Sequence, residues 1–147
     1  MGFDAFTAAF KELTESERDH LRRNCNQFTF EPGTDILNEG EFPEYIYVVT
    51  KGRVRVTHSM ALGSGGEFVT PLGPGETIGE MSFVDGLGAS ATLIADGEVV
   101  VEGIGHQVVE KLSAEDSGFA SRFYRSLLLV QVKRLRATNT RIPLPFA

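Results

Sequence analysis

Residues 74–92 read PGETIGEMSFVDGLGASAT, and this stretch predicts a strand, a tight turn that opens a short helix, and a returning strand. Gly79 has no Cβ, so the backbone can approach a ligand closely at that point. The amides of the helical turn around residues 82–84 would point outward at its positive end. The stretch therefore favours an anion-binding turn, and the alternative is an ordinary surface loop.

Two polar side chains would complete a pocket for one phosphate and one sugar. Glu80 lies one residue into the turn, where its carboxylate can accept hydrogen bonds from vicinal sugar hydroxyls. Ser90 supplies a hydroxyl from the opposite side, between two alanines that keep the approach narrow. The candidate ligand-binding residues of this stretch are Ile78, Gly79, Glu80, Met81, Ser82, Ala89, Ser90 and Ala91.

The order G-E-x-x-F-x-x-G-x-G-x-S-A-T in this stretch resembles the phosphate-binding cassette of the cyclic nucleotide-binding domain. This module is shared by the catabolite activator family, protein kinase A regulatory subunits and cyclic-nucleotide-gated channels. Residues 30–41 and 45–56 are similar to the two glycine-spaced strand pairs that open its β-roll. The resemblance covers about residues 13–142 and implies a regulatory sensor for cAMP, cGMP or a related small ligand, without catalysis.

One position departs from the family's pattern. The family carries an arginine two residues before the alanine that corresponds to Ala91, where it clamps the cyclic phosphate, and this chain has Ala89 there. A charge-assisted contact of this kind contributes about 1.5 to 3 kcal/mol, or roughly ten- to over a hundredfold in affinity. We therefore expect weak or altered ligand binding. The alternative is a degenerate domain that serves dimerisation or docking to another protein.

Basic residues near the C-terminus could replace this arginine if their helix folded across the pocket; they are Arg122, Arg125, Lys133, Arg134 and Arg136. The alternative is that they face solvent, as basic residues on helices usually do. Residues 1–116 hold all 20 acidic and 8 basic residues, a net charge of −12, whereas the remainder holds six basic residues and no acidic one, a net charge of +6. This asymmetry predicts docking of the basic segment on its own or a neighbouring subunit rather than on nucleic acid.

The spacing of apolar and turn residues predicts a mainly β fold with flanking helices. Eight strands are expected, at residues 28–31, 35–38, 45–50, 52–58, 67–71, 76–78, 90–95 and 99–105. Such a series indicates an eight-stranded β-roll of the jelly-roll, or double-stranded β-helix, type. Helices are expected at residues 3–11 and 15–26, the second opened by a capping box from Thr14 and Glu17. Val56 and Val69 would face inward and wall the pocket, with plain core packing as the alternative.

A helix at residues 106–112 and a long helix from 114 to about 139 are expected next, with Ser113 capping the turn between them. The long helix carries two apolar rows, namely Phe119, Phe123, Leu127 and Val130, and Tyr124, Leu128, Val132 and Leu135. One row should pack on the roll and the other on a second subunit, as in the homodimers of the family that the chain resembles. Thr138 and Asn139 resemble the polar pair that the catabolite activator family places against the base, with helix capping as the alternative.

The expected organisation is an N-terminal helical segment at 1–26, a β-roll at 27–105 with the cassette at 78–92, lid and dimerisation helices at 106–142, and a tail at 143–147. The tail has two prolines and no room for a helix-turn-helix, so a complete DNA-binding regulator is not expected. The absence of a long apolar run and of a signal peptide predicts a cytoplasmic protein with no membrane partner. His20, His58 and His106 lie far apart in the sequence, so no catalytic site, metal or cofactor is expected.

Overall fold

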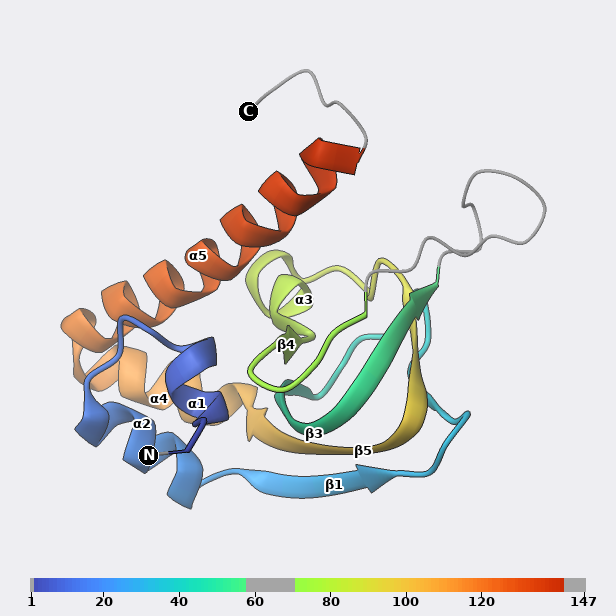
Figure 1. The fold of residues 1–147 in the computed structure, drawn as a ribbon. Coiled ribbons are helices and arrows are strands. Elements are labelled where there is room, and N and C mark those ends of the chain that lie inside the picture. Colours follow the sequence, from blue (N-terminus) through green and yellow to red (C-terminus); the bar gives the residue numbers. More distant parts are fainter. Residues whose placement is uncertain (1, 58–70, 142–147) are drawn as a thin grey trace.

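The computed structural model describes residues 2–57 and 71–141, which form a small sheet with helices before and after it in the chain (Figure 1). The elements are α1 Ala5–Ala9, α2 Glu15–Arg23, β1 Asn26–Phe30, β2 Asp35–Leu37, β3 Tyr45–Thr57, β4 Thr77–Ile78, α3 Glu80–Asp85, β5 Thr92–Gly105, α4 His106–Glu115 and α5 Ser117–Arg141. In Figure 1, α5 runs obliquely above α3, and α1, α2 and α4 gather near the start of α5.

The strands form one antiparallel sheet in the order β1-β5-β3-β4, and β2 pairs with the first part of β5. The prediction of a mainly β roll with N-terminal helices and a long C-terminal helix is confirmed. Four of the eight predicted strands merge into two, because β3 and β5 each continue through a bend. The predicted strand at 67–71 and its residue Val69 fall almost wholly outside the described residues.

The bend occurs where Gly52 of β3 meets residues 96–98 of β5. The register between the strands shifts here, with Lys51 opposite Val100 but Arg53 opposite Asp96. Gly52 has a φ of +91°, and a Cβ on it would lie 2.2 Å from the carbonyl oxygen of Glu98. Only glycine fits this backbone and this spacing, so the long strand pair can fold over into a roll.

Alternating side chains of the strands supply two cores. The core inside the roll consists of Ile36, Leu37, Val49, Val54, Leu72, Ile78, Leu93, Ala95, Val99 and Val101. The core between the sheet and the helices includes Phe6, Phe10, Leu13, Leu21, Ile46, Val48, Ile104, Val109, Phe119, Phe123 and Leu127. The first three apolar residues of the first predicted row of α5 therefore pack inward, as expected.

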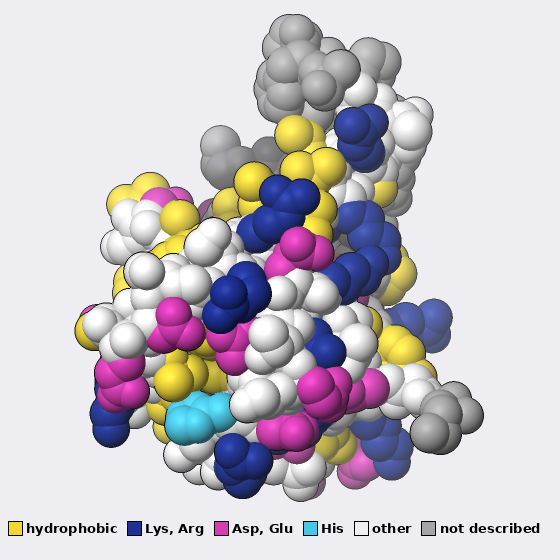
Figure 2. Space-filling model, turned by 90° about the vertical axis from the view of Figure 1, so that its left-hand side faces the viewer, with side chains coloured by type: hydrophobic (Ala, Val, Ile, Leu, Met, Phe, Trp, Pro, Cys, Tyr) yellow, Lys and Arg dark blue, Asp and Glu magenta, His cyan; other side chains and the backbone are white. Residues whose placement is uncertain are grey.

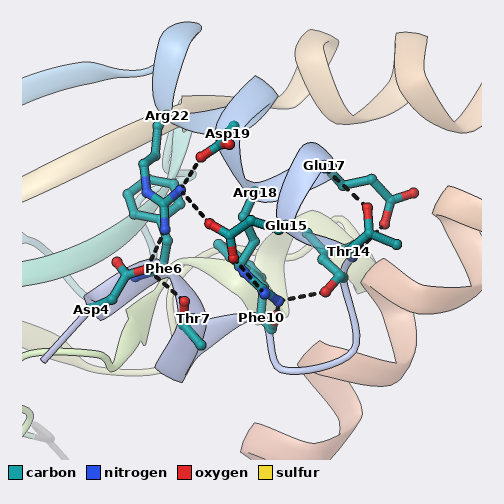
Figure 3. A network of polar contacts seen from close by, with 11 residues as sticks. Asp4, Phe6, Thr7, Phe10, Thr14, Glu15, Glu17, Arg18, Asp19 and Arg22 are labelled. Atoms are coloured by element: carbon teal, nitrogen blue, oxygen red, sulfur yellow. Dashed lines mark hydrogen bonds and ion pairs between the residues drawn. The ribbon is translucent and has the colours of Figure 1, made fainter. Parts of the chain in front are cut away.

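The N-terminal helices are shorter than predicted, but the capping box that opens α2 is confirmed. Thr14 Oγ1 accepts from the Glu17 amide at 3.2 Å, and Glu17 Oε1 accepts from the Thr14 amide at 2.9 Å. Helix α1 starts after its cap Asp4, and α2 ends at Arg23 because β1 pairing begins at Asn26. Figure 3 shows Arg22 of α2 reaching both Asp4 and Asp19, which ties α1 to α2.

The turn between α4 and α5 differs from the prediction. Ser113 does not cap it, because α4 continues through Ser113 to Glu115. The cap is Asp116, whose Oδ1 accepts from the Gly118 amide at 2.9 Å, in the usual manner of an aspartate at a helix N-terminus. Helix α5 starts at Ser117, not at residue 114, and includes Gly118.

The first part of α5 is fastened to the N-terminal helices. Arg122 donates to both carboxylate oxygens of Glu17, at 3.0 and 2.5 Å. Ser126 Oγ accepts from the Glu12 amide at 3.0 Å, and the Phe10 and Phe123 rings stack with centroids 5.4 Å apart. These contacts anchor one end of α5, and the remainder extends across the cassette (Figure 1).

Candidate ligand-binding pocket

The cassette starts as a strand and changes direction at a glycine. Thr77 and Ile78 pair with Val48 and Tyr47 of β3. Gly79 then adopts the left-handed region with φ +85°, and a Cβ there would lie 2.9 Å from the Tyr45 carbonyl oxygen. The tight turn thus requires a glycine, and it directs the chain into α3.

Helix α3 is a short helix of six residues, and the segment after it is fixed to the loop before β3. Gly86 closes α3 with its amide donating to the Ser82 carbonyl at 2.8 Å. Further on, the Ala89 amide donates to the Glu41 carbonyl and the Ala89 carbonyl accepts from the Gly40 amide, both at 2.8 Å. The returning segment around Ala89 is therefore held in a defined position opposite α3.

A cavity of about 600 Å³ lies between the cassette, the roll and α5. This volume falls within the usual range of small-molecule sites. The predicted residues that line it are Val56, Ile78, Gly79, Glu80, Met81, Ser82, Ala89, Ser90, Ala91 and Thr138. The structure brings these residues together from three separate parts of the chain.

One described residue of the prediction, Asn139, is not part of this lining, and Val69 lies outside the described residues. Thr138 reaches the cavity, but its hydroxyl donates to the Arg134 carbonyl at 2.9 Å, a common bond within helices.

Glu80 is the buried charge of the pocket, with 3% of its surface exposed. Its Oε1 accepts from Thr77 Oγ1 at 2.9 Å, and its Oε2 accepts from the Met81 amide at 3.2 Å. Arg134 of α5 also forms an ion pair with Oε1 through its Nη1. A buried carboxylate is stable only when it is paired and hydrogen-bonded, and Glu80 meets both conditions.

Arg134 connects α5 to the cassette at a second point. Its Nη2 donates to the Thr77 carbonyl at 2.6 Å, and its Nε lies 4.0 Å from Glu76 Oε1. A helix residue 54 positions away in the sequence from Glu80 thus reaches the pocket. From the sequence, Arg134 is one of five basic candidates, and nothing in the sequence distinguishes it from the other four.

Residues outside the prediction complete the lining. Leu37, Leu72 and Leu93 add apolar surface from the roll, Glu76 and Thr77 precede Ile78, and α5 contributes Gln131, Lys133, Arg134, Leu135 and Ala137. A signal for the α5 residues exists in the helical period. The buried row Phe119, Phe123, Leu127 continues at spacings of three and four residues through Gln131, Arg134 and Thr138.

A smaller hollow of about 390 Å³ adjoins the pocket and shares Glu80, Met81 and Gln131 with it. It lies between α3 and α5, and its walls are Glu80, Met81, Val84, Asp85, Tyr124, Leu127, Leu128 and Gln131. Figure 2 shows hydrophobic side chains beside Lys and Arg on the upper part of one face of the molecule. Exposed apolar residues of α5 are Tyr124, Leu128, Leu129, Val132 and Leu135.

A β-roll with such a cassette and a helix across its pocket defines a class of regulatory ligand-binding modules. The sequence identifies the family, because the protein-family model of the cyclic nucleotide-binding domain matches residues 27–116. The chain belongs to the cyclic nucleotide-binding domain family. The domain that this family model describes is regulatory and not catalytic.

Two curated relatives resemble this chain. It is 29% identical over 111 residues to a cAMP-dependent protein kinase regulatory subunit of Yarrowia lipolytica, an alignment that covers 76% of this chain and 28% of that protein. It is 26% identical over 110 residues to a cGMP-dependent protein kinase of Toxoplasma gondii, covering 75% of this chain and 10% of that protein. The chain therefore spans only a minor part of the length of these relatives.

A solved structure of a cyclic nucleotide-binding domain from Methylobacillus flagellatus has the same fold. The TM-score is 0.80 at 21% identity, and the match covers 93% of this chain and 82% of that chain.

Within residues 2–57 and 71–141, no helix has both the length and the hydropathy of a membrane span. The same residues contain no group of three His, Cys, Asp or Glu side chains arranged to hold a metal ion.

Proposed function

We propose that this domain is a sensor that binds cAMP, cGMP or a related small ligand and signals through α5. The observation that carries the proposal is the cavity of about 600 Å³ that the family's cassette forms together with α5. The relatives' names refer to kinases that depend on cAMP or cGMP, which supports the choice of ligand. Ala89, at the position of the family's arginine, argues for weaker binding than the family pattern implies.

The signal would pass from the cassette to α5 through an aromatic contact. Phe83 of α3 lies 6.1 Å from the Phe123 ring and 6.2 Å from the Tyr124 ring, measured between centroids. Leu87, just after α3, is 65% exposed and can repack without leaving a core position. Closure of the cassette turn on a ligand would move Phe83 and Leu87, and α5 would shift in response.

Isothermal titration calorimetry with cAMP and cGMP tests this function on the native chain and on Ala89→Arg. We expect binding by both proteins, tighter by roughly ten- to a hundredfold in the variant because its guanidinium gains a charge-assisted contact with the phosphate. Adenosine and guanosine, which have no phosphate, serve as control ligands. Absence of binding to both proteins would reject the proposal.

A second candidate function is assembly, either into a homodimer or with another protein. The observation in its favour is the exposed second row of α5, formed by Tyr124, Leu128, Val132 and Leu135. An unpartnered apolar helix face of this length is typical of an interface. We propose a second copy of the chain as its occupant, because the family dimerises through this helix.

A further inference from the structure

The cassette supplies no positive charge to the pocket that could neutralise a phosphate. Ala89 contributes no charge, and Glu80 contributes a buried negative one. The other charged residues of the described lining are Glu76, Lys133 and Arg134. A phosphate entering beside Glu80 and Glu76 would be repelled unless a cation lay close to it.

Arg134 lies in the pocket wall and has free N–H donors, so it can neutralise a ligand phosphate. Three quarters of its side chain is buried, with 25% exposed. One terminal nitrogen serves Glu80 and the other serves the Thr77 carbonyl. Its Nε is buried and has no hydrogen-bond acceptor in the described part of the chain, with Glu76 Oε1 too distant at 4.0 Å. A guanidinium carries five N–H donors, so donors remain for a ligand oxygen.

We propose that Arg134 supplies the positive charge for the ligand's phosphate in place of the cassette arginine, while its other edge stays on Glu80. This proposal rests on the proposed function, and it assigns a phosphate contact to a residue outside the cassette. The same guanidinium would then touch the ligand, the cassette and α5. Ligand binding would be coupled directly to the position of the helix.

The neighbouring basic residues of α5 do not have this position. Lys133 lines the cavity but is exposed, and Arg136 is exposed and lies outside the lining. Gln131, Arg134 and Thr138 share one helix face because they are spaced by three and four residues, and all three line the cavity. Helical geometry therefore turns Arg134 inward and Arg136 outward.

The test is the affinity of four proteins for cAMP and cGMP, measured by calorimetry and compared with that of Ala89→Arg. They are the native chain, Arg134→Gln, the control Arg136→Gln, and the double variant Ala89→Arg with Arg134→Gln. We expect Arg134→Gln to weaken binding by roughly ten- to a hundredfold, because a charge-assisted contact is lost. Arg136→Gln should stay within about twofold of the native chain, because surface charges contribute little. The double variant should regain most of the lost affinity.

Unchanged or tighter binding by Arg134→Gln would overturn the proposal, and tighter binding would mean that Arg134 competes with the ligand for Glu80. Binding by Ala89→Arg but not by the native chain would also overturn it, while the function itself would stand for the scaffold. Absence of binding to both the native chain and Ala89→Arg would reject the proposed function together with the role of Arg134.

A further variant, Arg134→Lys, keeps the positive charge but lacks the planar guanidinium, so it should lose less affinity than Arg134→Gln. It replaces that variant if thermal unfolding shows that Arg134→Gln does not fold.

Discussion

At the scale of single residues, Gly79 has the most demanding backbone of the cassette. It combines a φ of +85° with a close approach to Tyr45, whose carbonyl oxygen would lie 2.9 Å from an added Cβ. Gly86, at the other end of α3, has a similar φ of +74° but nothing within 4 Å of an added Cβ. The two glycines therefore separate the cost of the backbone conformation from the cost of the steric contact.

We predict that Gly79→Ala destabilises the fold more than Gly86→Ala. The left-handed conformation costs a non-glycine residue roughly 1 to 2 kcal/mol, which both variants incur. Gly79→Ala adds a clash with the Tyr45 carbonyl oxygen of β3 and close contacts with the Pro43 ring, so a total loss of about 2 to 4 kcal/mol is expected. Urea unfolding of both variants measures the difference. Equal losses would mean that β3 yields and that the contact is not decisive.

At the scale of the elements, an ion pair with two hydrogen bonds joins α2 to α5. Arg122 donates to both oxygens of Glu17, and this hydrogen bonding is the main reason that the pKa of Glu17 lies below its ordinary value of 4.5. A carboxyl with a lowered folded pKa stabilises the fold above its unfolded pKa. That contribution is lost as the pH falls through the folded pKa.

Glu17→Gln should therefore lower the denaturation midpoint at pH 7, and the difference from the native chain should shrink below about pH 4.5. Glu12→Gln is the matched control. Glu12 also pairs with an arginine of α5, Arg125, but the two side chains are 37% and 66% exposed. Water screens such a pair, so we expect a smaller loss. A loss for Glu17→Gln that does not vary with pH would assign it to the capping box rather than to the ion pair.

The element scale also shows what the sequence can and cannot predict. The strand pattern predicts the roll, and the Gly-Glu turn of the cassette predicts the part of the pocket wall that lies between Ile78 and Ala91, because both depend on local spacing. Continuity through Gly52 is not predictable in this way, since a glycine breaks the strand pattern whether the chain ends a strand or bends within one. The structure keeps the strand because β5 bends at the same place.

The contribution of α5 to the pocket depends on long-range packing. Phe119, Phe123 and Leu127 fix the rotation of α5 by inserting into the helical core. Once that rotation is set, Arg134 must face the cassette, but the sequence alone does not state which apolar row packs inward. The basic candidates therefore stay equivalent until the core is known.

At the scale of the whole molecule, α5 presents two faces with different partners. Near the start of α5, the inner face packs in the helical core; further along the helix, it lines the pocket. The outer face leaves Leu128 61% exposed, with Tyr124 45% and Val132 38% exposed; Leu135, at the end of this row, is 39% exposed and also lines the pocket. Burial of such a row against a copy of itself would remove apolar surface from water and stabilise a symmetric pair.

We predict that the native chain is a dimer in solution and that Leu128→Lys makes it a monomer. Charges at the centre of an apolar helix interface remain unpaired and desolvated in the assembly, so the variant favours the separate chains. Gln107→Lys adds the same charge at an exposed position of α4 and should leave the dimer intact. Sedimentation velocity over a concentration series distinguishes the species. A native chain that stays monomeric throughout would reject the homodimer and leave the row of α5 open to a different protein.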